Sequence, residues 1–342
     1  MNQVTPEKLA KLDSLLRANG PVCIVTHSHP DGDALGSTIA LGDFVRVHYG
    51  QQPSLLIPDA APAELAFLTK DELILDASLD TRAADLIGQA GLILCADFNR
   101  FNRTGSLEQA LTATTCPKVL IDHHLNPDPV PFDLVFSRTD ISSASELVYE
   151  ILKAMPQTCG RADRLPRKCA TALMTGMTTD TNNFANSVYP GTLRMAADLI
   201  EAGVDRDRIV RHLFFEYREN RVRAISRLLQ DHLSLSDNGI ALIVVTRAFM
   251  DEMDLRDGEL EGLVNIPLSI ASVHMSLLLR EEAEFFRVSI RAKEGWSANR
   301  LATDHFHGGG HELAAGGRLF VPEDIPDKSM AGTYVRKVTE LL

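Results

Sequence analysis

The sequence predicts an α/β protein, in which a doubly wound and mainly parallel sheet is joined by helices to a smaller α/β domain with a mixed sheet. In the first half, short continuous apolar runs alternate with segments of helical periodicity. Continuous runs are typical of strands that are buried on both faces of a parallel sheet. A charged helical segment follows, and the last third returns to strand-like runs. We therefore expect a first domain over residues 1–190, a helical connector over 191–235 and a second domain over 236–342.

Local patterns predict the elements of the first part. Thr5-Pro6 indicates a helix start, because proline is favoured at the first helical position. Asp33 to His48 carries apolar residues at helical spacing, and Ser143-Ala144-Ser145-Glu146 is typical of a capping box that opens a helix running to about Met155. The predicted strands, bounded by Gly, Pro and Asp, are Val22 to Thr26, Leu55 to Ile57, Leu92 to Ala96 and Val119 to Ile121.

The charged segment from about Thr192 to His232 has a helical pattern without strand-like runs. We interpret its many arginines as a solvated helix face and not as a binding surface. Beyond it, the predicted strands are Ile240 to Val245, Val273 to Leu279 and Phe285 to Ala292, and the predicted helices lie near Gly258 to Asn265, Asn299 to Phe306 and Gly332 to Leu342.

Length, charge and cysteine use narrow the functional classes. A chain of 342 residues is long for a single core, so two domains are expected. The net charge of -12 argues against extended, sequence-independent binding to duplex nucleic acid. A small anionic substrate needs only a local cluster of metal ions, Arg and His. The five cysteines are widely spaced without a C-x-x-C pair, which indicates reduced thiols. Because no signal-like or membrane-spanning apolar stretch stands out, we expect a soluble cytoplasmic protein.

Acidic and histidine residues gather where the predicted strands end. The first strand leads directly into His27-Ser28-His29-Pro30-Asp31-Gly32-Asp33. The strand Leu92 to Ala96 is followed by Asp97, and the strand Val119 to Ile121 is followed by Asp122-His123-His124. A fourth segment, Gly176 to Thr179, leads to Asp180. Ligand sites in doubly wound sheets lie at the carboxyl ends of the strands, so we expect these side chains to share one site.

Each of these residues also has an ordinary structural interpretation. A single Asp after a strand is most often a turn former or a helix cap, Asp33 could cap the helix that follows it, and His29 could hydrogen-bond within its turn. Four segments that end alike favour a shared site over coincidence. Carboxylates crowded at one sheet edge raise one another's pKa and need a cation. Carboxylate and imidazole ligands without thiolates favour manganese or magnesium over a structural zinc, and we predict two divalent ions.

These segments resemble the motifs of the DHH phosphoesterase family, whose name-giving triplet stands here as Asp122-His123-His124. The opening motif is similar to the family's His-x-Asn-Pro-Asp-Gly-Asp, with His29 in the place where Asn is common. Asp97 and the Thr-Asp-Thr around Asp180 follow in the family's order, and the resemblance covers nearly the whole chain.

The resemblance implies a role for each of these residues. Two divalent ions, with manganese preferred and magnesium as the alternative, would be bridged by Asp97, which is also a catalytic residue because it would organise the attacking water. Asp122 would orient its neighbours by hydrogen bonds, and the catalytic His124 would face the substrate phosphate. The ligands of one ion would be His27 and Asp31, and those of the other would be Asp33, His123 and Asp180.

The last part carries a second resemblance, to the domain that accompanies DHH proteins acting on nucleotides. Its marks are Val288-Ser289-Ile290-Arg291 on a strand and Gly308-Gly309-Gly310-His311 leading into Glu312 to Ala315. Glycines let the backbone approach a ligand closely, and a helix starting after them would offer N–H groups to an anion. The implied substrate contacts are Ser289, Arg291, Gly308, Gly309, Gly310 and His311. Arg103, in an Arg-x-Gly that often follows the bridging acid, would either touch the substrate or brace its loop.

The two-domain layout is similar to the nanoRNase and pAp-phosphatase branch of the family. That resemblance implies hydrolysis of short single-stranded oligoribonucleotides and dinucleotides to mononucleotides, and dephosphorylation of 3′-phosphoadenosine 5′-phosphate (pAp) to AMP. The glycine-rich segment argues against pyrophosphate as the substrate. One alternative is a phosphodiesterase that acts on linear dinucleotides from cyclic-dinucleotide turnover. Another is a non-catalytic nucleotide sensor, which is disfavoured because all six candidate ligand positions are intact. A homodimer is left open.

Overall fold

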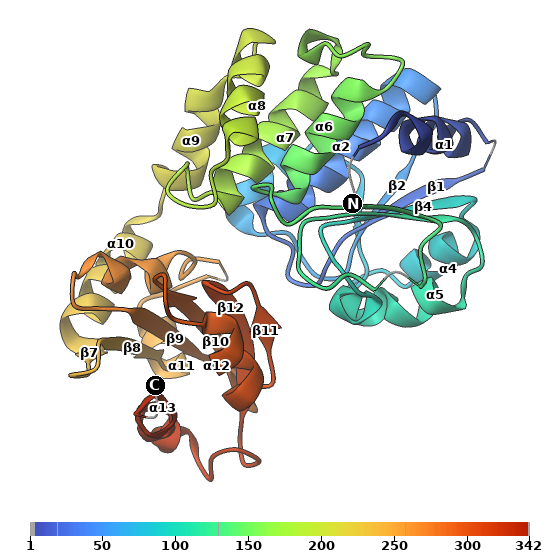
Figure 1. The fold of residues 1–342 in the computed structure, drawn as a ribbon. Coiled ribbons are helices and arrows are strands. Elements are labelled where there is room, and N and C mark those ends of the chain that lie inside the picture. The colour runs from blue at the N-terminus through green and yellow to red at the C-terminus, as the bar shows by residue number, and fades with distance from the viewer. Residues whose placement is uncertain (1–3, 19, 129, 257, 341–342) are drawn as a thin grey trace. The chain divides into compact units, whose positions relative to one another are not determined.

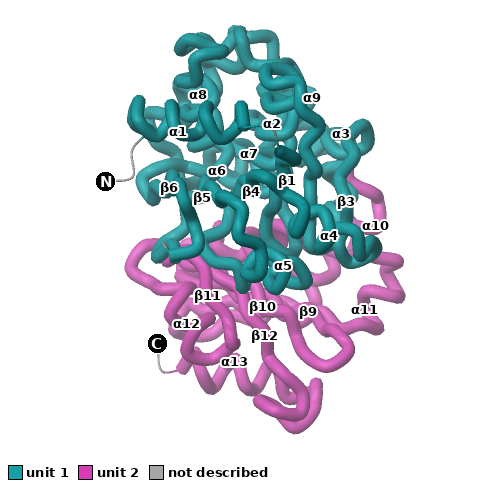
Figure 2. Tube along the Cα trace, turned by 90° about the vertical axis from the view of Figure 1, so that its right-hand side faces the viewer, with its two compact units in different colours: residues 1–216 teal, residues 217–342 magenta. Residues whose placement is uncertain are grey.

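The computed structural model describes residues 4–18, 20–128, 130–256 and 258–340. The chain divides into two compact units, Met1–Glu216 (unit 1) and Tyr217–Leu342 (unit 2), which Figure 2 shows in different colours. Each unit has its own sheet and its own hydrophobic core. The boundary falls inside the segment that the sequence predicts as a helical connector, and the division into three functional parts stays a prediction.

Unit 1 contains a six-stranded parallel sheet (Figure 1). Its strands are β1 (Val22–Val25), β2 (Ser54–Ile57), β3 (Ile74–Asp76), β4 (Leu92–Ala96), β5 (Lys118–Asp122) and β6 (Leu134–Ser137). They lie in the order β3-β2-β1-β4-β5-β6, which confirms the predicted doubly wound fold. Every residue of β1, β4 and β5 is buried, because helices cover both faces of the sheet.

The helices of unit 1 form two layers (Figure 1). They are α1 (Pro6–Arg17), α2 (Gly32–Tyr49), α3 (Ala66–Thr69), α4 (Arg82–Gly88), α5 (Glu108–Ala113), α6 (Ala144–Ala154), α7 (Arg167–Asp180), α8 (Pro190–Glu201) and α9 (Arg206–Phe214), with short 3-10 turns at Ala63–Leu65, Phe101–Leu107 and Ala162–Arg164. On one face, α2, α6 and α7 share a core with α1, α8 and α9. On the other face, α4 and α5 cover a second, smaller core.

The strand order places the carboxyl ends of β1, β4 and β5 next to one another. The chain moves from β1 outward to β3 and then returns to β4 on the other side of β1. β1 pairs with β4, and β4 pairs with β5, all in parallel register. The loops that follow these three strands therefore leave the same edge of the sheet, where doubly wound folds bind their ligands.

Helix α6 begins as the sequence predicts, but only half of its expected cap forms. Ser143 Oγ accepts a hydrogen bond from the N–H of Glu146 at 3.0 Å. Instead of reaching back to Ser143, the buried Glu146 carboxylate accepts the N–H and the hydroxyl of Ser142 and the hydroxyl of Thr192 in α8. The carboxylate therefore ties the start of α6 to α8, and the capping box is left open.

Unit 2 contains a six-stranded mixed sheet in the order β11-β12-β10-β9-β8-β7, as the sequence predicts for the second domain. Its strands are β7 (Leu233–Leu235), β8 (Ile240–Val245), β9 (Met275–Glu281), β10 (Phe285–Ala292), β11 (Gly309–Gly310) and β12 (Ala314–Phe320). β8 and β9 pair in parallel, and the other described pairs are antiparallel. The helices are α10 (Glu219–Arg227), α11 (Arg247–Glu252), α12 (Ala298–His305) and α13 (Ala331–Thr339), with a π turn at Leu228–His232 and 3-10 turns at Leu263–Ser269 and Lys328–Met330.

Two of the helices predicted for unit 2 do not form in the described residues. Residues 258–262 form turns and Leu263–Ser269 is a 3-10 turn, so there is no α-helix over Gly258 to Asn265. Gly258 and Gly262 have φ of 88° and 82°, which an α-helix does not accommodate. The helix expected after the glycine triplet is the strand β12. The end of the predicted helix Gly332 to Leu342 lies outside the described residues. Among those that are described, none of the helices combines the length and the hydropathy that a membrane crossing requires.

Candidate metal centre and active site

The loop after β1 supplies His27 and Asp31. His27 is 6% exposed, its Nδ1 lies 2.9 Å from the carbonyl oxygen of Ser28, and its Nε2 lies 3.3 Å from Asp97 Oδ2. Asp31 is exposed, and its Oδ1 accepts two N–H groups at the start of α2, each at 3.0 Å. Asp31 is therefore the N-cap of α2, and the alternative that Asp33 has this role is wrong.

Asp97 lies at the centre of the cluster. It follows β4 with a left-handed φ of 63°, and its N–H donates to the carbonyl of Ile121 at 3.0 Å. Its Oδ2 faces His27, whereas its Oδ1 lies 3.5 Å from His123 Nε2 and 3.7 Å from His124 Nδ1. Within the described part of the chain, Oδ1 is buried and accepts no hydrogen bond. A buried carboxylate oxygen of this kind is unfavourable unless a cation binds to it.

Asp33 is held by the first turn of α6. Its two carboxylate oxygens accept the N–H groups of Ala144 and Ser145 at 2.7 and 2.8 Å. These bonds fix the orientation of the carboxylate, whose Oδ2 lies 3.8 Å from His123 Nε2. This contact could not be predicted from the sequence, because Asp33 and Ala144 are 111 positions apart and no local pattern links them.

Asp180 reaches the site from a helix, which corrects the expectation that it follows a strand. It is the last residue of α7, and its Oδ2 lies 3.7 Å from His123 Nε2. α7 packs closely against α2, where a Cβ on Gly36 would lie 2.6 Å from a carbonyl oxygen of α7. A Cβ on Gly176 would lie 2.0 Å from Ser145 Oγ. Glycine at these two positions therefore allows the helix approach that brings Asp180 to the cluster.

The two histidines of the triplet both lie near Asp97 but differ in their other partners. Asp122 is fully buried, its Oδ2 accepts the N–H of His124 at 3.1 Å, and its Oδ1 lies 2.7 Å from His124 Nδ1. These contacts set the orientation of the His124 ring. His123 instead directs Nε2 toward the carboxylates of Asp33, Asp97 and Asp180. The geometry suits a ligand role for His123 and a separate role for His124.

Arg103 contacts the loop that carries His27. Its carbonyl oxygen accepts the N–H of Ser28 at 2.7 Å. Gly105 has φ of 54°, and a Cβ there would lie 2.4 Å from Ser28 Oγ, so glycine at this position lets the two loops approach. Burial lowers the pKa of His124, and the positive charge of Arg103 lowers it further. The backbone of Arg103 therefore braces the loop, and direct contact of its side chain with substrate stays a prediction.

Three groups of side chains in unit 1 could each hold a cation, and Asp97 belongs to all of them; one consists of Asp97, Asp122 and His124, and the other two match the ligand sets that the resemblance implies. Ligand atoms of His27, Asp31 and Asp97 all lie within 4.8 Å of one another, and so do those of Asp33, Asp97 and His123. Both groups offer oxygen and nitrogen donors, which suit manganese and magnesium. The residues therefore fit divalent cations. The assignment of two ions, and of Asp180 as a further ligand, stays a prediction.

His29 is half-exposed, and its backbone N–H donates to Asp59 Oδ2 at 2.8 Å.

The carboxylates and imidazoles of this cluster shift one another's pKa. Burial opposes ionisation, but His123 and His27 hold the pKa of Asp97 well below its usual value. Burial also disfavours imidazolium, yet Asp180 and Asp97 raise the pKa of His123. Burial, together with Asp97 and Asp180, raises the pKa of Asp33 well above its usual value. The cluster therefore holds protons that a metal ion has to displace.

We expect the affinity of the chain for Mn²⁺ to rise with pH through the neutral range. His123 is protonated below its raised pKa, so low pH favours the protonated, metal-free site and high pH favours the metal-bound one. Each displaced proton should change the dissociation constant about tenfold per pH unit. Titration calorimetry in two buffers of different ionisation enthalpy counts the protons that are released. Metal binding that is independent of pH would contradict this description of the cluster.

The substrate contacts predicted for the last part lie in unit 2. Ser289 and Arg291 are half-buried on one face of β10, and Arg291 Nη1 donates to the carbonyl of Ile290 at 2.9 Å. His311 is half-buried in the turn between β11 and β12, where its N–H donates to the carbonyl of Ala314 at 2.8 Å. Their roles in substrate binding stay predictions.

The glycine segment differs from the anion site expected for it. The N–H of Gly308 donates to the carbonyl of Ala302 at 3.2 Å, and the N–H of Gly310 donates to Asn299 Oδ1 at 2.9 Å. A Cβ on Gly308 would lie 2.0 Å from the carbonyl oxygen of Gly316, so glycine permits two backbone segments to cross here. The glycines are followed by a strand, and these two N–H groups are already hydrogen-bonded. The prediction that a helix N-terminus binds an anion here is therefore wrong.

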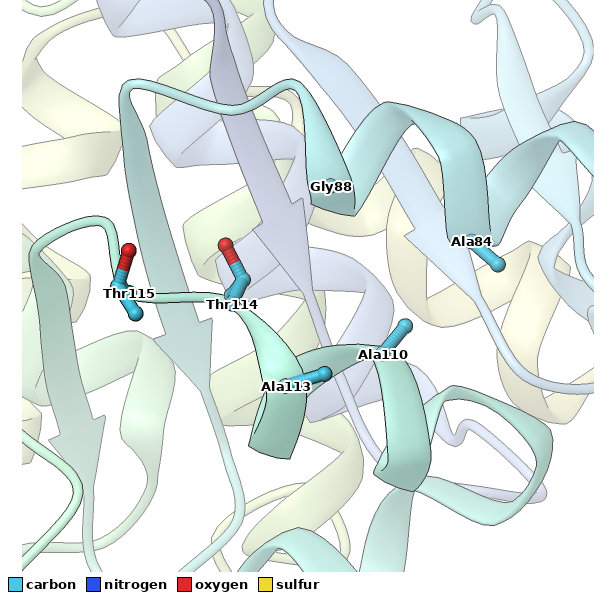
Figure 3. Close-up of a pocket in the computed structure, with 6 residues that line it drawn as sticks. All are labelled: Ala84, Gly88, Ala110, Ala113, Thr114 and Thr115. Carbon is cyan, nitrogen blue, oxygen red and sulfur yellow. The ribbon is translucent and has the colours of Figure 1, made fainter.

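Unit 1 also contains a pocket whose lining includes none of the residues of the acidic cluster, and Figure 3 shows the residues that line it. It opens between α4 and α5, and its lining residues are Ala84, Gly88, Ala110, Ala113, Thr114 and Thr115. Gly88 stands shortly before β4, and Thr114 and Thr115 stand shortly before β5, so the pocket lies near the amino ends of these strands. The lining carries no titratable side chain. This pocket is therefore no candidate for the chemistry.

Comparison with known proteins identifies the family. Residues 21–177 match the DHH family, N-terminal domain. The crystal structure of an exopolyphosphatase-related protein from Bacteroides fragilis is 30% identical with a TM-score of 0.90, and the match covers 100% of this chain and 98% of that one. The chain belongs to the DHH family. The family match spans the loop after β1, Asp97 and the triplet, and it ends shortly before Asp180.

Curated proteins of known name resemble the chain over most of its length. A protein from Streptococcus mutans named probable bifunctional oligoribonuclease and PAP phosphatase NrnA is 25% identical over 311 residues, which are 89% of this chain and 91% of that protein. The cyclic-di-AMP phosphodiesterase GdpP from Geobacillus thermodenitrificans is 28% identical over 320 residues, which are 90% of this chain and 46% of that protein. These relatives confirm the family that the motifs predict.

Proposed function

We propose that the chain is a metal-dependent phosphoesterase that hydrolyses short oligoribonucleotides to mononucleotides and converts pAp to AMP. The observation that carries this proposal is the pair of side-chain groups that share the buried Asp97. Two adjacent divalent cations suit the hydrolysis of a phosphate ester, because charge develops on both the attacking and the leaving oxygen. DHH relatives named bifunctional oligoribonuclease and PAP phosphatase support this choice of substrates.

The contacts in unit 1 support different roles for the residues of the candidate site. The residues that would hold the cations are His27, Asp31, Asp33, Asp97, His123 and Asp180. When bound, the ions would neutralise the substrate phosphate and lower the pKa of the water molecule that attacks it. The first turn of α6 orients Asp33, and Asp122 orients His124. His124 would face the substrate phosphate, and Arg103 would add positive charge beside it.

The proposal includes the expected partners. Manganese is the preferred ion, with magnesium as the alternative. We expect short single strands, dinucleotides and pAp as substrates and no long duplex, because the net charge is -12. A cytoplasmic location belongs to the same proposal. The similarity to a cyclic-di-AMP phosphodiesterase supports linear dinucleotides from cyclic-dinucleotide turnover as a second candidate substrate.

A product profile tests the proposed function. Purified protein with manganese is incubated separately with pAp, dinucleotides, oligoribonucleotides of rising length and pyrophosphate. We expect rapid release of AMP from pAp, rapid hydrolysis of dinucleotides, and rates that fall as the oligonucleotide lengthens. Hydrolysis of pyrophosphate alone would overturn the proposed substrates. Loss of pAp hydrolysis with retained dinucleotide hydrolysis would favour the second candidate.

Arg291→Ala should lower kcat/KM for a dinucleotide or pAp by about tenfold to a hundredfold. A charge-assisted hydrogen bond to a phosphate is typically worth about 1.5 to 3 kcal/mol, and its loss in the transition state appears in kcat/KM. A nitrophenyl phosphodiester, which lacks a second nucleotide, should lose much less. Arg300→Ala, at an exposed position of α12, is the matched control and should change neither rate. An equal loss on both substrates would show that Arg291 supports the fold and has no substrate contact.

A further inference from the structure

The first turn of α6 lies against the two helices that bring carboxylates to the acidic cluster. On one side, the N–H groups of Ala144 and Ser145 bind the carboxylate of Asp33 in α2. On another side, a Cβ on Gly176 of α7 would lie 2.0 Å from Ser145 Oγ. Gly176 stands about one turn before Asp180, the last residue of α7. The position of this single turn therefore affects both carboxylates.

The next residue of this turn, Glu146, connects it to α8. Glu146 is 2% exposed. Its Oε2 accepts the N–H of Ser142 at 3.1 Å and the hydroxyl of Thr192 at 2.7 Å, and it also accepts the Ser142 hydroxyl. The start of α8 packs directly onto this carboxylate, since a Cβ on Gly191 would lie 2.6 Å from Oε1. Hydrogen bonds to a carboxylate are shorter and stronger than those between neutral groups, so they fix the two segments relative to each other.

Stability by itself does not account for a carboxylate at this place. Ser142 and Thr192 are neutral partners, and the removal of a carboxylate from water is costly. An apolar contact between α6 and α8 would join the helices without that cost. The core of unit 1 already contains apolar residues of both helices, such as Leu147 and Leu199. The carboxylate adds direction to this core, because its hydrogen bonds set where the first turn of α6 lies along α8.

Thr192 joins the Glu146 carboxylate to the loop of residues 181–189, which follows Asp180. The Thr192 hydroxyl accepts the N–H of Tyr189 at 3.1 Å, at the end of this loop. Residues of the loop with a left-handed φ are Asn182 (46°), Asn183 (56°), Phe184 (67°) and Ser187 (51°). This conformation is unfavourable for residues other than glycine, and it persists where surrounding contacts impose it. The hydrogen bonds of Thr192 supply such a contact at the end of the loop.

We propose that Glu146 and Thr192 are positioning residues for the cation that Asp33 and Asp180 would bind. Their contact fixes the turn that orients Asp33, and it fixes the end of the loop that begins next to Asp180. The inference rests on the proposed function, because it assigns these two carboxylates to one cation. Residues that orient metal ligands through hydrogen bonds typically change metal affinity about tenfold to a hundredfold.

A matched pair of variants at Thr192 tests this contact. Thr192→Val keeps the shape of the side chain and removes the hydroxyl, whereas Thr192→Ser keeps the hydroxyl. Titration calorimetry with Mn²⁺ is performed on the full chain after removal of metal, so the readout does not depend on turnover. We expect Thr192→Val to bind Mn²⁺ about tenfold to a hundredfold more weakly than wild type and Thr192→Ser to bind it as wild type does.

Two backgrounds assign the effect to one group of ligands. His27→Ala removes a ligand of the other group, so the Mn²⁺ binding that remains belongs to the group with Asp33. In this background Thr192→Val should again weaken Mn²⁺ binding about tenfold or more. In the Asp33→Asn background, where the group with His27 remains, Thr192→Val should change Mn²⁺ affinity little. A loss of the same size in both backgrounds would indicate a general structural role and would overturn the proposal.

Variants of the carboxylate complete the test. Glu146→Ala should weaken Mn²⁺ binding at least as much as Thr192→Val, and Glu146→Gln, which keeps an acceptor oxygen, should retain part of the affinity. Glu150→Ala is the matched control: Glu150 lies one turn later on α6, and its carboxylate pairs with Arg138 at 2.6 Å. It should leave Mn²⁺ affinity unchanged, and an equal loss in this variant would contradict the proposal. If Glu146→Ala does not fold, the pair of variants at Thr192 still decides.

The same titrations separate this inference from the proposed function. Wild-type Mn²⁺ affinity in a folded Thr192→Val protein would overturn the positioning role and leave the metal centre intact. If wild type itself bound no Mn²⁺, the proposed function would fail, and the positioning role would fail with it.

Discussion

Asp97→Ala should lower turnover of pAp and dinucleotides by at least about a thousandfold. Asp97 belongs to all of the candidate cation groups in unit 1 and is 2% exposed, so no neighbouring side chain can take its place. Metal ions contribute several kcal/mol of charge stabilisation in such a transition state, and each 1.4 kcal/mol is about a factor of ten in rate. Elemental analysis of the purified variant should show lost metal together with the lost rate.

The control for Asp97→Ala is Asp85→Ala, an exposed carboxylate on α4 that lies outside the candidate cation groups. It should keep wild-type rate and metal content. Circular dichroism and the melting temperature establish that both variants are folded. Wild-type activity in a folded Asp97→Ala protein would disprove the assignment of a bridged metal pair.

His123→Ala and His124→Ala should separate metal binding from catalysis. His123 Nε2 faces three carboxylates, so its loss should lower metal content and, with it, the rate. His124 is oriented by Asp122, so its loss should leave metal content intact and lower kcat. We expect kcat to fall by about a hundredfold to ten-thousandfold, which is the usual range for a residue that hydrogen-bonds or transfers a proton in the transition state.

The measured ratio of metal to protein in the His123→Ala and His124→Ala variants distinguishes the two roles. His212→Ala, which removes an imidazole from α9, is the control and should alter neither metal content nor rate. Equal metal loss in the His123 and His124 variants would mean that the two roles are wrongly assigned. Conversely, full metal content in both variants would remove His123 from the ligand set.

Local patterns predicted most of the fold because its main strands are buried on both faces. Continuous apolar runs indicated β1, β2, β4 and β5, and their parallel order follows from the helices between them. The short edge strands β3 and β6 were not predicted, since runs of three or four residues carry little pattern. The glycine segment was misinterpreted because its glycines serve the crossing of two backbone segments, a cause that has no local signature.

The amino-acid pattern established the set of chemical groups in the candidate site and their order along the chain. His27, Asp31, Asp97, His123 and His124 all directly follow or lie shortly after strands that meet at one sheet edge, so their approach could be inferred. The tertiary structure decided the rest. Asp180 arrives on α7 because glycines let two helices pack closely, and α6 orients Asp33 from 111 positions away. The hydroxyl of Thr192 contacts the Glu146 carboxylate across 46 positions. These contacts depend on packing and pairing between distant segments, and spacing along the chain does not encode the distances between them.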